Sequence, residues 1–279
     1  MKKYFFLFFA LAFYGSAVAQ NPNSQKVDPA NPYQFSIDLT KIHSDLLSVN
    51  LTTPAFTTDT AYYRMPAIVP GTYKVYNFGK FVSNFHAFDK SGKEITVVHS
   101  DVNTWKIPNA KNLDHLSYDV EDTWDSDQKG EVVFEPAGTN FQVDSNFVLN
   151  NHAIFGYFDG MKKNIYKINI THPNGFYGST GLSDVTRNGN KDIFSVPDYM
   201  QLVDGPIMYD IPDTTHILLG GADILVSVYS PNHLVSSKFV ADSLRILLDL
   251  LHICIDGVFP EFICPFLNGY IELCRFSIG

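Results

Sequence analysis

The sequence predicts a mainly β protein: an antiparallel β-sandwich or saddle-like β-sheet domain, followed by one C-terminal helix and an irregular tail. Three observations support this fold class. Short runs of alternating apolar and polar residues recur along most of the chain, as expected of strands with one buried face. Turn-forming Gly, Pro, Asn and Asp separate these runs. Tyr and Phe, which favour strands, number 15 and 23 against 2 Trp.

The N-terminal segment is expected to be a targeting signal followed by a linker. The basic pair Lys2 and Lys3, an apolar stretch and the small-residue run SAVA indicate that residues 1–19 are a cleaved signal peptide. The apolar stretch is too short to cross a bilayer of about 30 Å as a helix. Residues 20–31 are polar and contain Pro and Asn, which predicts a flexible leader. The mature protein is therefore expected in the periplasm or outside the cell.

The charge of the chain argues against a nucleic-acid partner. The net charge is −9, and loss of two of the 20 basic residues with the signal peptide leaves 18 against 29 acidic residues, or −11. A protein that neutralises phosphates needs clustered Lys and Arg, whereas the basic residues here are scattered singly. We therefore expect no nucleic-acid binding.

A β-rich domain is predicted over residues 32–231. Alternation is clearest in its first strand and in the strands at 115–121 and 166–171, which have the pattern of antiparallel strands with one buried face. Ser91-Gly92 and Gly220-Gly221 fit hairpin turns. In order, the expected strands are 33–40, 47–51, 62–68, 81–88, 94–99, 103–107, 115–121, 166–171, 215–219 and 223–229.

The stretch from Met65 to Phe85, MPAIVPGTYKVYNFGKFVSNF, joins two of these strands and is expected to organise the domain. Pro70-Gly71 is a turn pair, because Pro presets φ and Gly accepts positive φ. The apolar residues that follow, Val75 among them, are expected to form a cluster. Gly79 in their midst predicts a bulge or a close approach of two backbones. By pattern alone, this is a Pro-kinked hairpin of the core.

After Pro231 the apolar period becomes helical, with Ser236 or Ser237 as the N-cap, and a helix is predicted over residues 232–249. Residues 250–279 hold all three cysteines and no Lys, and their apolar residues follow no clean period. We expect this tail to be aberrant or unstructured, as a frameshift or truncation would produce. A membrane-associated tail is the alternative, but acidic residues interrupt every window long enough to span.

The sequence contains none of the common catalytic motifs. The chain has no H-E-x-x-H, no G-x-S-x-G and no phosphate-binding Gly loop, and its cysteines lack zinc-site spacing. Asp125 and Asp127 resemble the start of a calcium loop, but a Lys occupies a ligand position. The acidic run from Glu121 to Asp127 could hold a glycosidase-type carboxylate pair, although a solvated loop is favoured. His152 is expected to be a core or rim histidine instead of a metal ligand.

Four motifs in series carry a family resemblance: the Met65–Phe85 stretch, Asn103-Thr104-Trp105, NNHAIFGYFDG around His152, and DYMQLVDGPIM from Asp198 to Met208. Together they resemble the N-terminal domain of the glycyl aminopeptidase family of zinc metallopeptidases, whose members often carry a PDZ domain. The resemblance covers about residues 33–248. It implies a β-rich domain ahead of a helical catalytic domain of thermolysin type, which supplies H-E-x-x-H and a downstream Glu as zinc ligands.

The resemblance places Tyr199, Gln201 and Asp204 where the N-terminal domain meets the catalytic cleft, as candidate substrate-binding residues. The family pattern is approximately Tyr-x-Glu-Leu-x-Asp-small-Pro-Ile, and Gln201 stands where Glu is usual. A carboxylate could hold a substrate's ammonium by a charge-assisted hydrogen bond, roughly twice as strong as a neutral one, whereas Gln201 offers only its carbonyl oxygen. Independently of the family, Asp204-Gly205-Pro206 is good turn chemistry.

These observations predict the non-catalytic N-terminal domain of an exported glycyl-aminopeptidase-like metallopeptidase, ending just inside the catalytic domain. In complete relatives it would support the cleft and help place the substrate's N-terminus. No zinc or other cofactor is expected in this chain, and a peptide substrate only in a complete relative. The alternative is a free-standing secreted β-sandwich module that binds peptide or glycan. It requires an exposed surface of aromatic residues such as Trp105, Trp124, Tyr157 and Phe158.

Overall fold

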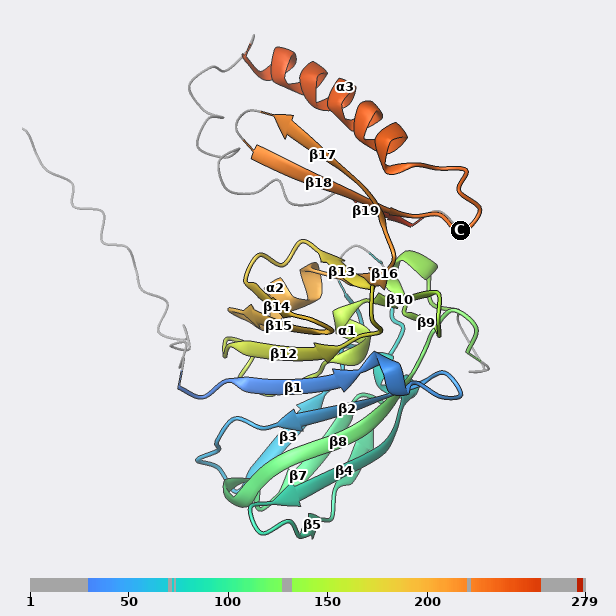
Figure 1. The fold of residues 1–279 in the computed structure, drawn as a ribbon. Helices are drawn as coiled ribbons and strands as arrows, with labels where there is room; N and C mark the ends of the chain where they lie inside the picture. The colour runs from blue at the N-terminus through green and yellow to red at the C-terminus, as the bar shows by residue number, and fades with distance from the viewer. Residues whose placement is uncertain are drawn as a thin grey trace, which may run out of the picture.

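A computed structural model describes residues 30–69, 72, 74–126, 132–219, 222–256 and 275–277. The described part is mainly β, as the sequence predicts (Figure 1). Its strands form one sheet of eight strands, two of four and one of three. The predicted signal peptide and all of the leader except its last two residues lie outside the described residues, so those predictions are not tested.

The eight-stranded sheet forms one layer of the main core. In β1, Tyr33, Phe35 and Ile37 are buried and the residues between them are not, which confirms the alternation expected there. In spatial order the strands are β14 (Val185–Asn188), β15 (Lys191–Val196), β12 (Tyr166–Thr171), β1 (Tyr33–Asp38), β2 (Leu46–Thr52), β8 (Leu113–Glu121), β4 (Val82–Asp89) and β5 (Glu94–Ile95).

One strand of this sheet differs from its expected direction. β12 was expected to be purely antiparallel; it is antiparallel to β15 but runs parallel to β1, with Tyr33 paired to Tyr166. Alternation reports which face of a strand is buried, and it carries no information about the direction of the neighbour. The sheet is therefore mixed.

A second layer packs its aromatic residues against the large sheet, as in a sandwich. Tyr63 and Trp105 of this layer share one core with Tyr118 and Leu116 of the large sheet. Its order is β11 (Tyr157–Phe158), β3 (Thr60–Arg64), β7 (Thr104–Pro108) and β6 (Val98–Asp101). The prediction of a single strand over residues 94–99 is wrong, because the chain leaves the large sheet after β5 and enters the second layer at β6.

The third sheet was not predicted from the sequence. All four residues of β16 are buried, so both its faces are covered and no alternation marks it. The order is β13 (Tyr177–Thr180), β16 (Ile207–Asp210), β10 (Asn146–Leu149) and β9 (Asn140–Gln142). Short helical turns connect the sheets: η1 (Leu39–Lys41), η2 (Phe78–Phe81), η3 (Ala110–Asn112), η4 (Glu135–Ala137), α1 (Asn151–Ile154) and α2 (Tyr199–Asp204).

Gly79 lies in η2 at a close contact between two backbones, as the sequence predicts. A Cβ on Gly79 would lie 2.1 Å from the carbonyl oxygen of Val102, and its N–H donates to the Asn103 Oδ1 at 3.0 Å. The Pro70-Gly71 turn falls outside the described residues. Val75 is 55% exposed and does not join the predicted apolar cluster. The stretch is thus a loop pinned through Gly79, with a strand on each side.

A hairpin and a helix form a second, smaller core beside the main one (Figure 1). The strands β17 (Asp213–Leu219) and β18 (Ala222–Tyr229) confirm the predicted last hairpin, whose Gly220-Gly221 turn is not described. The helix α3 (Ser237–Asp256) packs Val240 and Ala241 on the hairpin, and the Ser236 hydroxyl accepts from the Phe239 N–H at 3.1 Å as an N-cap.

Part of the tail differs from the sequence expectation. α3 extends to Asp256, beyond the predicted end at residue 249. Three further residues form β19 (Arg275–Ser277), which runs parallel to β18. The remainder, residues 257–274 and 278–279, lies outside the described residues. The sequence-based boundary after residue 231 separates α3 from the hairpin, although the two share one apolar cluster.

Candidate functional site

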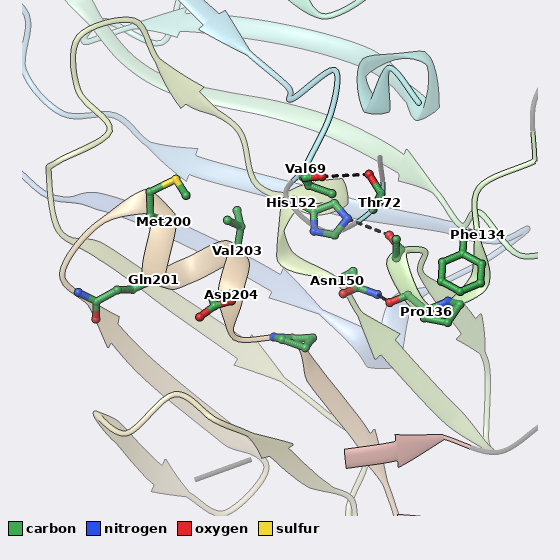
Figure 2. Close-up of a pocket in the computed structure, with 12 residues that line it drawn as sticks. Val69, Thr72, Phe134, Pro136, Asn150, His152, Met200, Gln201, Val203 and Asp204 are labelled. Carbon is green, nitrogen blue, oxygen red and sulfur yellow. Dashed lines mark hydrogen bonds between the residues drawn. The ribbon is translucent and has the colours of Figure 1, made fainter. Parts of the chain in front are cut away.

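A cleft of about 580 Å³ lies between α2 and the segment that contains η4. Figure 2 shows α2 on one side, with Met200, Gln201, Val203 and Asp204, and His152 and Asn150 on the other. The described residues that line the cleft are Val69, Thr72, Phe134, Pro136, Ala137, Asn150, His152, Met200, Gln201, Val203, Asp204 and Pro206.

The helix α2 begins at a well-formed N-cap. The carboxylate of Asp198 accepts from the Gln201 N–H at 3.0 Å, and Gly205 ends the helix. The turn chemistry noted at Asp204-Gly205-Pro206 is thus the exit of a short helix. Because Leu202 is fully buried on the inner face, Gln201 and Asp204 are turned to the outer face and are exposed.

Buried asparagines tie the walls of the cleft together. The Asn151 amide donates to the carbonyls of Leu202 and Gly205 at 3.0 and 2.6 Å, which fixes the end of α2. The Asn150 amide donates to the carbonyl of Gly138 at 2.5 Å and to that of Pro136 at 3.1 Å. Two adjacent side chains therefore hold the two opposite walls. The sequence motif NNHAIF was part of the family resemblance, but it did not identify this role.

His152 is a buried rim residue with a neutral ring. Its Nε2 lies 2.8 Å from the carbonyl oxygen of Ala137, and its ring meets that of Phe78 edge to face at 4.7 Å. Burial lowers the pKa of His152 to about 4, so the ring is neutral at pH 7 and Nε2–H is the donor. This confirms the sequence interpretation of a core or rim histidine.

The three predicted site residues separate into two groups. Gln201 and Asp204 line the cleft, whereas Tyr199 is 3% exposed and lies beneath it. The Tyr199 hydroxyl donates to the Phe155 carbonyl at 3.1 Å, and its ring packs against Tyr157 and Tyr166. Tyr199 is therefore a core residue that positions α2 and does not line the cleft.

Charge within the cleft is unbalanced. Among the described residues that line the cleft, Asp204 is the only acidic or basic one apart from neutral His152. Among the described residues, neither the Asp204 carboxylate nor the Gln201 amide group has a side-chain hydrogen-bond partner. Asp204 also ends α2, where the helix carbonyls add negative potential. The cleft thus presents an unpaired negative charge on an otherwise neutral, largely apolar surface.

The described residues contain no group of three or more His, Cys, Asp and Glu placed to hold a metal ion. The calcium-loop candidate is described only as far as residue 126, so its remaining positions are not tested. Across the same described ranges, no helix is long and apolar enough to cross a membrane.

The aromatic surface that a peptide- or glycan-binding module requires is largely internal. Trp105 is 3% exposed and Phe158 is fully buried in the main core. The Trp124 indole N–H donates to the Glu135 carbonyl at 2.9 Å, and Tyr157 is half-buried. Burial of these rings argues against the alternative assignment.

Comparison with known families identifies the domain. The model of the Peptidase M61 N-terminal domain matches residues 34–210. The chain belongs to the Peptidase M61 N-terminal domain family. The match ends just before β17, so the M61 domain comprises the three sheets of the main part and includes α2 and the cleft.

One of the similar solved structures supports the same fold, and a second has only weak similarity. An aminopeptidase N family protein from Idiomarina loihiensis is similar with a TM-score of 0.64 and 20% identity, covering 80% of this chain and 35% of that chain. An M1 zinc metallopeptidase from Deinococcus radiodurans is similar with a TM-score of 0.39 and 10% identity over 78% of this chain and 52% of its own. The chain therefore spans about a third to a half of these proteins. No curated protein matches.

Proposed function

We propose that the M61 domain of this chain is the non-catalytic, substrate-placing part of an exported glycyl-aminopeptidase-like metallopeptidase. In this proposal the cleft beside α2 receives the free amino group of a peptide, while a separate helical domain performs the zinc chemistry. The described residues offer no fitting zinc site, so no catalytic step is assigned to them. Export rests on the sequence of residues 1–19.

The charge on Asp204 is the observation that carries this proposal. A peptide's amino terminus is an ammonium near neutral pH, and its complement is a carboxylate with free lone pairs. Asp204 is such a carboxylate at the exposed edge of the cleft, and among the described residues no Lys or Arg lines the cleft to compete for it. The apolar side chains of Met200 and Val203 beside it would contact the first residues of the peptide.

Gln201 modifies this recognition. Its amide lies one turn before Asp204 on the exposed side of α2 and offers one neutral carbonyl acceptor. A second carboxylate at this position would strengthen the attraction for an ammonium, because charge-assisted hydrogen bonds are stronger than neutral ones. We therefore propose a weaker hold on the amino group than a Glu at this position would give.

The decisive test is binding by a peptide and by its acetylated counterpart. The full chain is titrated with Gly-Ala-Ala and with N-acetyl-Gly-Ala-Ala while amide chemical shifts are followed by NMR. The free peptide should shift the amides of α2 with a Kd on the order of 1 mM, typical of one exposed charge with a few apolar contacts. The acetylated peptide, which has no ammonium, should bind less well.

Matched variants make the test specific. Asp204→Asn should remove the preference for the free amine, and Gln201→Glu should increase it. Asp184→Asn removes an exposed carboxylate that does not line the cleft, and it should leave the preference unchanged. Equal binding of both peptides to the unmodified chain would rule out an amino-group site at Asp204.

A separate measurement tests the non-catalytic assignment. The purified chain should release no amino acid from peptides that begin with Gly or Ala, and elemental analysis should find no stoichiometric zinc. One zinc per chain together with chelator-sensitive release of amino acids would overturn the assignment.

A further inference from the structure

A second hollow, of about 530 Å³, shares no lining residue with the cleft, lies on the outer face of the second layer and includes two basic residues. Its lining residues are Arg64, Tyr157, Asp159, Gly160 and Lys162. Neither the family resemblance nor the cleft beside α2 accounts for this grouping.

The strand register places the main components of the hollow in one row. Tyr157 of β11 pairs with Arg64 of β3, which pairs with Thr104 of β7. Directly opposed residues of neighbouring strands project to the same face of a sheet. Asp159, two residues beyond Tyr157, projects to that face as well. Tyr157, Arg64 and Thr104 therefore form a continuous row across three strands.

The Arg64 guanidinium is held in place from two sides. Its Nε donates to the Asp159 carboxylate at 2.5 Å, and its Nη1 donates to the Thr104 hydroxyl at 2.7 Å. The hydrogen bond that Arg64 donates to Asp159 raises the pKa of Arg64 and keeps it protonated. Nη2 has no acceptor among the described residues. A guanidinium with two anchored nitrogens presents this third nitrogen without further loss of side-chain entropy.

Lys162 supplies a second cation. Its ammonium lies 4.0 Å from the centre of the Tyr157 ring and 5.7 Å from that of Tyr199. It forms no ion pair with any residue that the structure describes. The Lys162 carbonyl accepts from the Tyr199 N–H at 2.8 Å, so the backbone beneath the side chain is fixed to the core. A cation stacked on an aromatic ring keeps its charge available on the open side.

Gly160 contributes a backbone donor. It turns the chain with φ of 78° between β11 and Lys162, and its N–H has no acceptor in the described part of the chain. The hollow itself is lined by two cations and by the carboxylate of Asp159, which is already bound to Arg64, while the carboxylate of Asp101 acts on Arg64 from outside the lining. A free N–H beside cationic side chains is a common composition of an oxyanion site.

We propose that this hollow is a binding site for a small oxyanion, a carboxylate or a phosphate, held by Lys162, the free edge of Arg64 and the Gly160 N–H. The site is independent of the cleft beside α2 and of any role in peptide hydrolysis. Because both cations are partly exposed, binding is weak and decreases as salt concentration rises.

The test is an NMR titration of the full chain at constant NaCl, once with inorganic phosphate and once with N-acetylglycine. At least one ligand should produce saturable shifts of the amides of residues 157–162, with a Kd on the order of 1 mM. Saturation by phosphate alone assigns a phosphate site, and saturation by N-acetylglycine alone assigns a carboxylate site. No saturable shift in these residues with either ligand, up to about 20 mM, overturns the proposal.

Three variants separate site binding from general charge attraction. Lys162→Gln should weaken binding about fivefold, the effect of one partly exposed charge. Asp159→Asn removes the opposing carboxylate while Thr104 still anchors Arg64, so it should strengthen binding. Lys167→Gln removes an equal charge from β12, away from the hollow, and should have no effect. Equal weakening by Lys162→Gln and Lys167→Gln, or weakening by Asp159→Asn, would overturn the assignment.

Discussion

The hydroxyls of Tyr63 and Tyr118 lie 2.8 Å apart in the core, and their hydrogen bonds run in one direction. The Gly156 N–H donates to the Tyr63 oxygen, and the Tyr118 hydroxyl donates to the Ile154 carbonyl. Since the single hydroxyl hydrogen of Tyr118 is used on Ile154, Tyr63 must donate to Tyr118. The chain of hydrogen bonds is therefore closed at both ends by the backbone of one buried segment.

This relationship extends to two further tyrosines. Tyr33 accepts from the Phe158 N–H and Tyr199 donates to the Phe155 carbonyl, so four hydroxyls serve the backbone of residues 154–158. Buried backbone groups outside regular structure must find such partners. The segment carries His152 to the cleft at one end and Tyr157 to the oxyanion hollow at the other. The tyrosines thus set the geometry of both candidate sites.

We expect Tyr118→Phe to destabilise the domain by about 1–3 kcal/mol, because it leaves the Ile154 carbonyl buried without a donor. Urea unfolding followed by circular dichroism measures this change. Tyr62→Phe is the control, since Tyr62 is 36% exposed and lies next to Tyr63. If the two substitutions lowered the free energy of unfolding equally, the chain of hydrogen bonds through Tyr63 and Tyr118 would add nothing to stability.

Gly79→Ala should destabilise the domain by about 1–3 kcal/mol or more, since the new methyl group would overlap the backbone at Val102 and Asn103. Thermal unfolding of the variant measures the loss. Ser83→Ala, at an exposed position of the adjoining strand β4, should change the midpoint little. If the Gly79→Ala variant has the same unfolding midpoint as the unmodified chain, the close contact relaxes without loss of stability.

Asp122 should give the protein a characteristic dependence on pH. It is 2% exposed, accepts from the Phe141 and Trp124 N–H groups, and burial, with Asp125 nearby, raises its pKa to about 7. The unfolded carboxyl has a pKa of about 3.9, so between these values the folded state holds a proton that the unfolded state releases. The stabilisation of the folded state by protonated Asp122 is fully present below pH 4 and is lost as the pH rises through 7.

The Asp122→Asn variant isolates this effect. The difference in unfolding free energy between the unmodified chain and the variant should shrink by up to about 1.4 kcal/mol per pH unit from pH 4 to 7, and then remain constant. Urea titrations at several pH values measure it. A difference independent of pH across this range would show that Asp122 is ionised in the folded state.

His152 should make the stability of the protein depend on pH in the opposite direction to Asp122. Its folded pKa of about 4 lies below the unfolded value of about 6.5, so the unfolded state binds the extra proton between these values. Its contribution to stability is present above pH 6.5 and is lost as the pH falls through 4. In His152→Gln, the rise in stability from pH 4 to 6.5 should be smaller than in the unmodified chain. If stability rises by the same amount from pH 4 to 6.5 in the variant and in the unmodified chain, His152 is not the source of that rise.

Deletion after Pro231 should affect the two cores differently. The truncated chain loses Val240 and Ala241, which cover Ile224 and Val226 of the hairpin. Amides of β17 and β18 should lose protection from hydrogen exchange, while those of β1, β2 and β8 keep theirs, because the main core does not include α3. Loss of protection throughout the chain would show that the two cores unfold as one unit.

Sequence patterns were sufficient for several strands that bury one face. In β1, β2 and β8 the period of two is visible in the residues themselves, and Gly79 was recognisable because a glycine among large apolar residues implies close backbone contact. β10 and β16 were not predicted, because burial on both faces removes the alternation. The change of sheet between β5 and β6 leaves no local signal either.

For the candidate site, the motif DYMQLVDGPIM located α2 in the sequence, and family resemblance indicated its importance. Which of its residues face the cleft depends on the inner face of α2, where Tyr199 and Leu202 are buried. The opposite wall comes from residues about 50 positions earlier, joined through Asn151. The oxyanion hollow likewise depends on the pairing of β11, β3 and β7.

The sequence by itself determined the β class, several of the strands with one buried face, the capped C-terminal helix and the family of the domain, because these depend on residues close together in the chain. The tertiary structure decided the direction of β12, the burial of Tyr199 and the assembly of both candidate sites. These features arise from contacts between distant segments, whose free energies depend on packing and buried hydrogen bonds that local patterns do not encode.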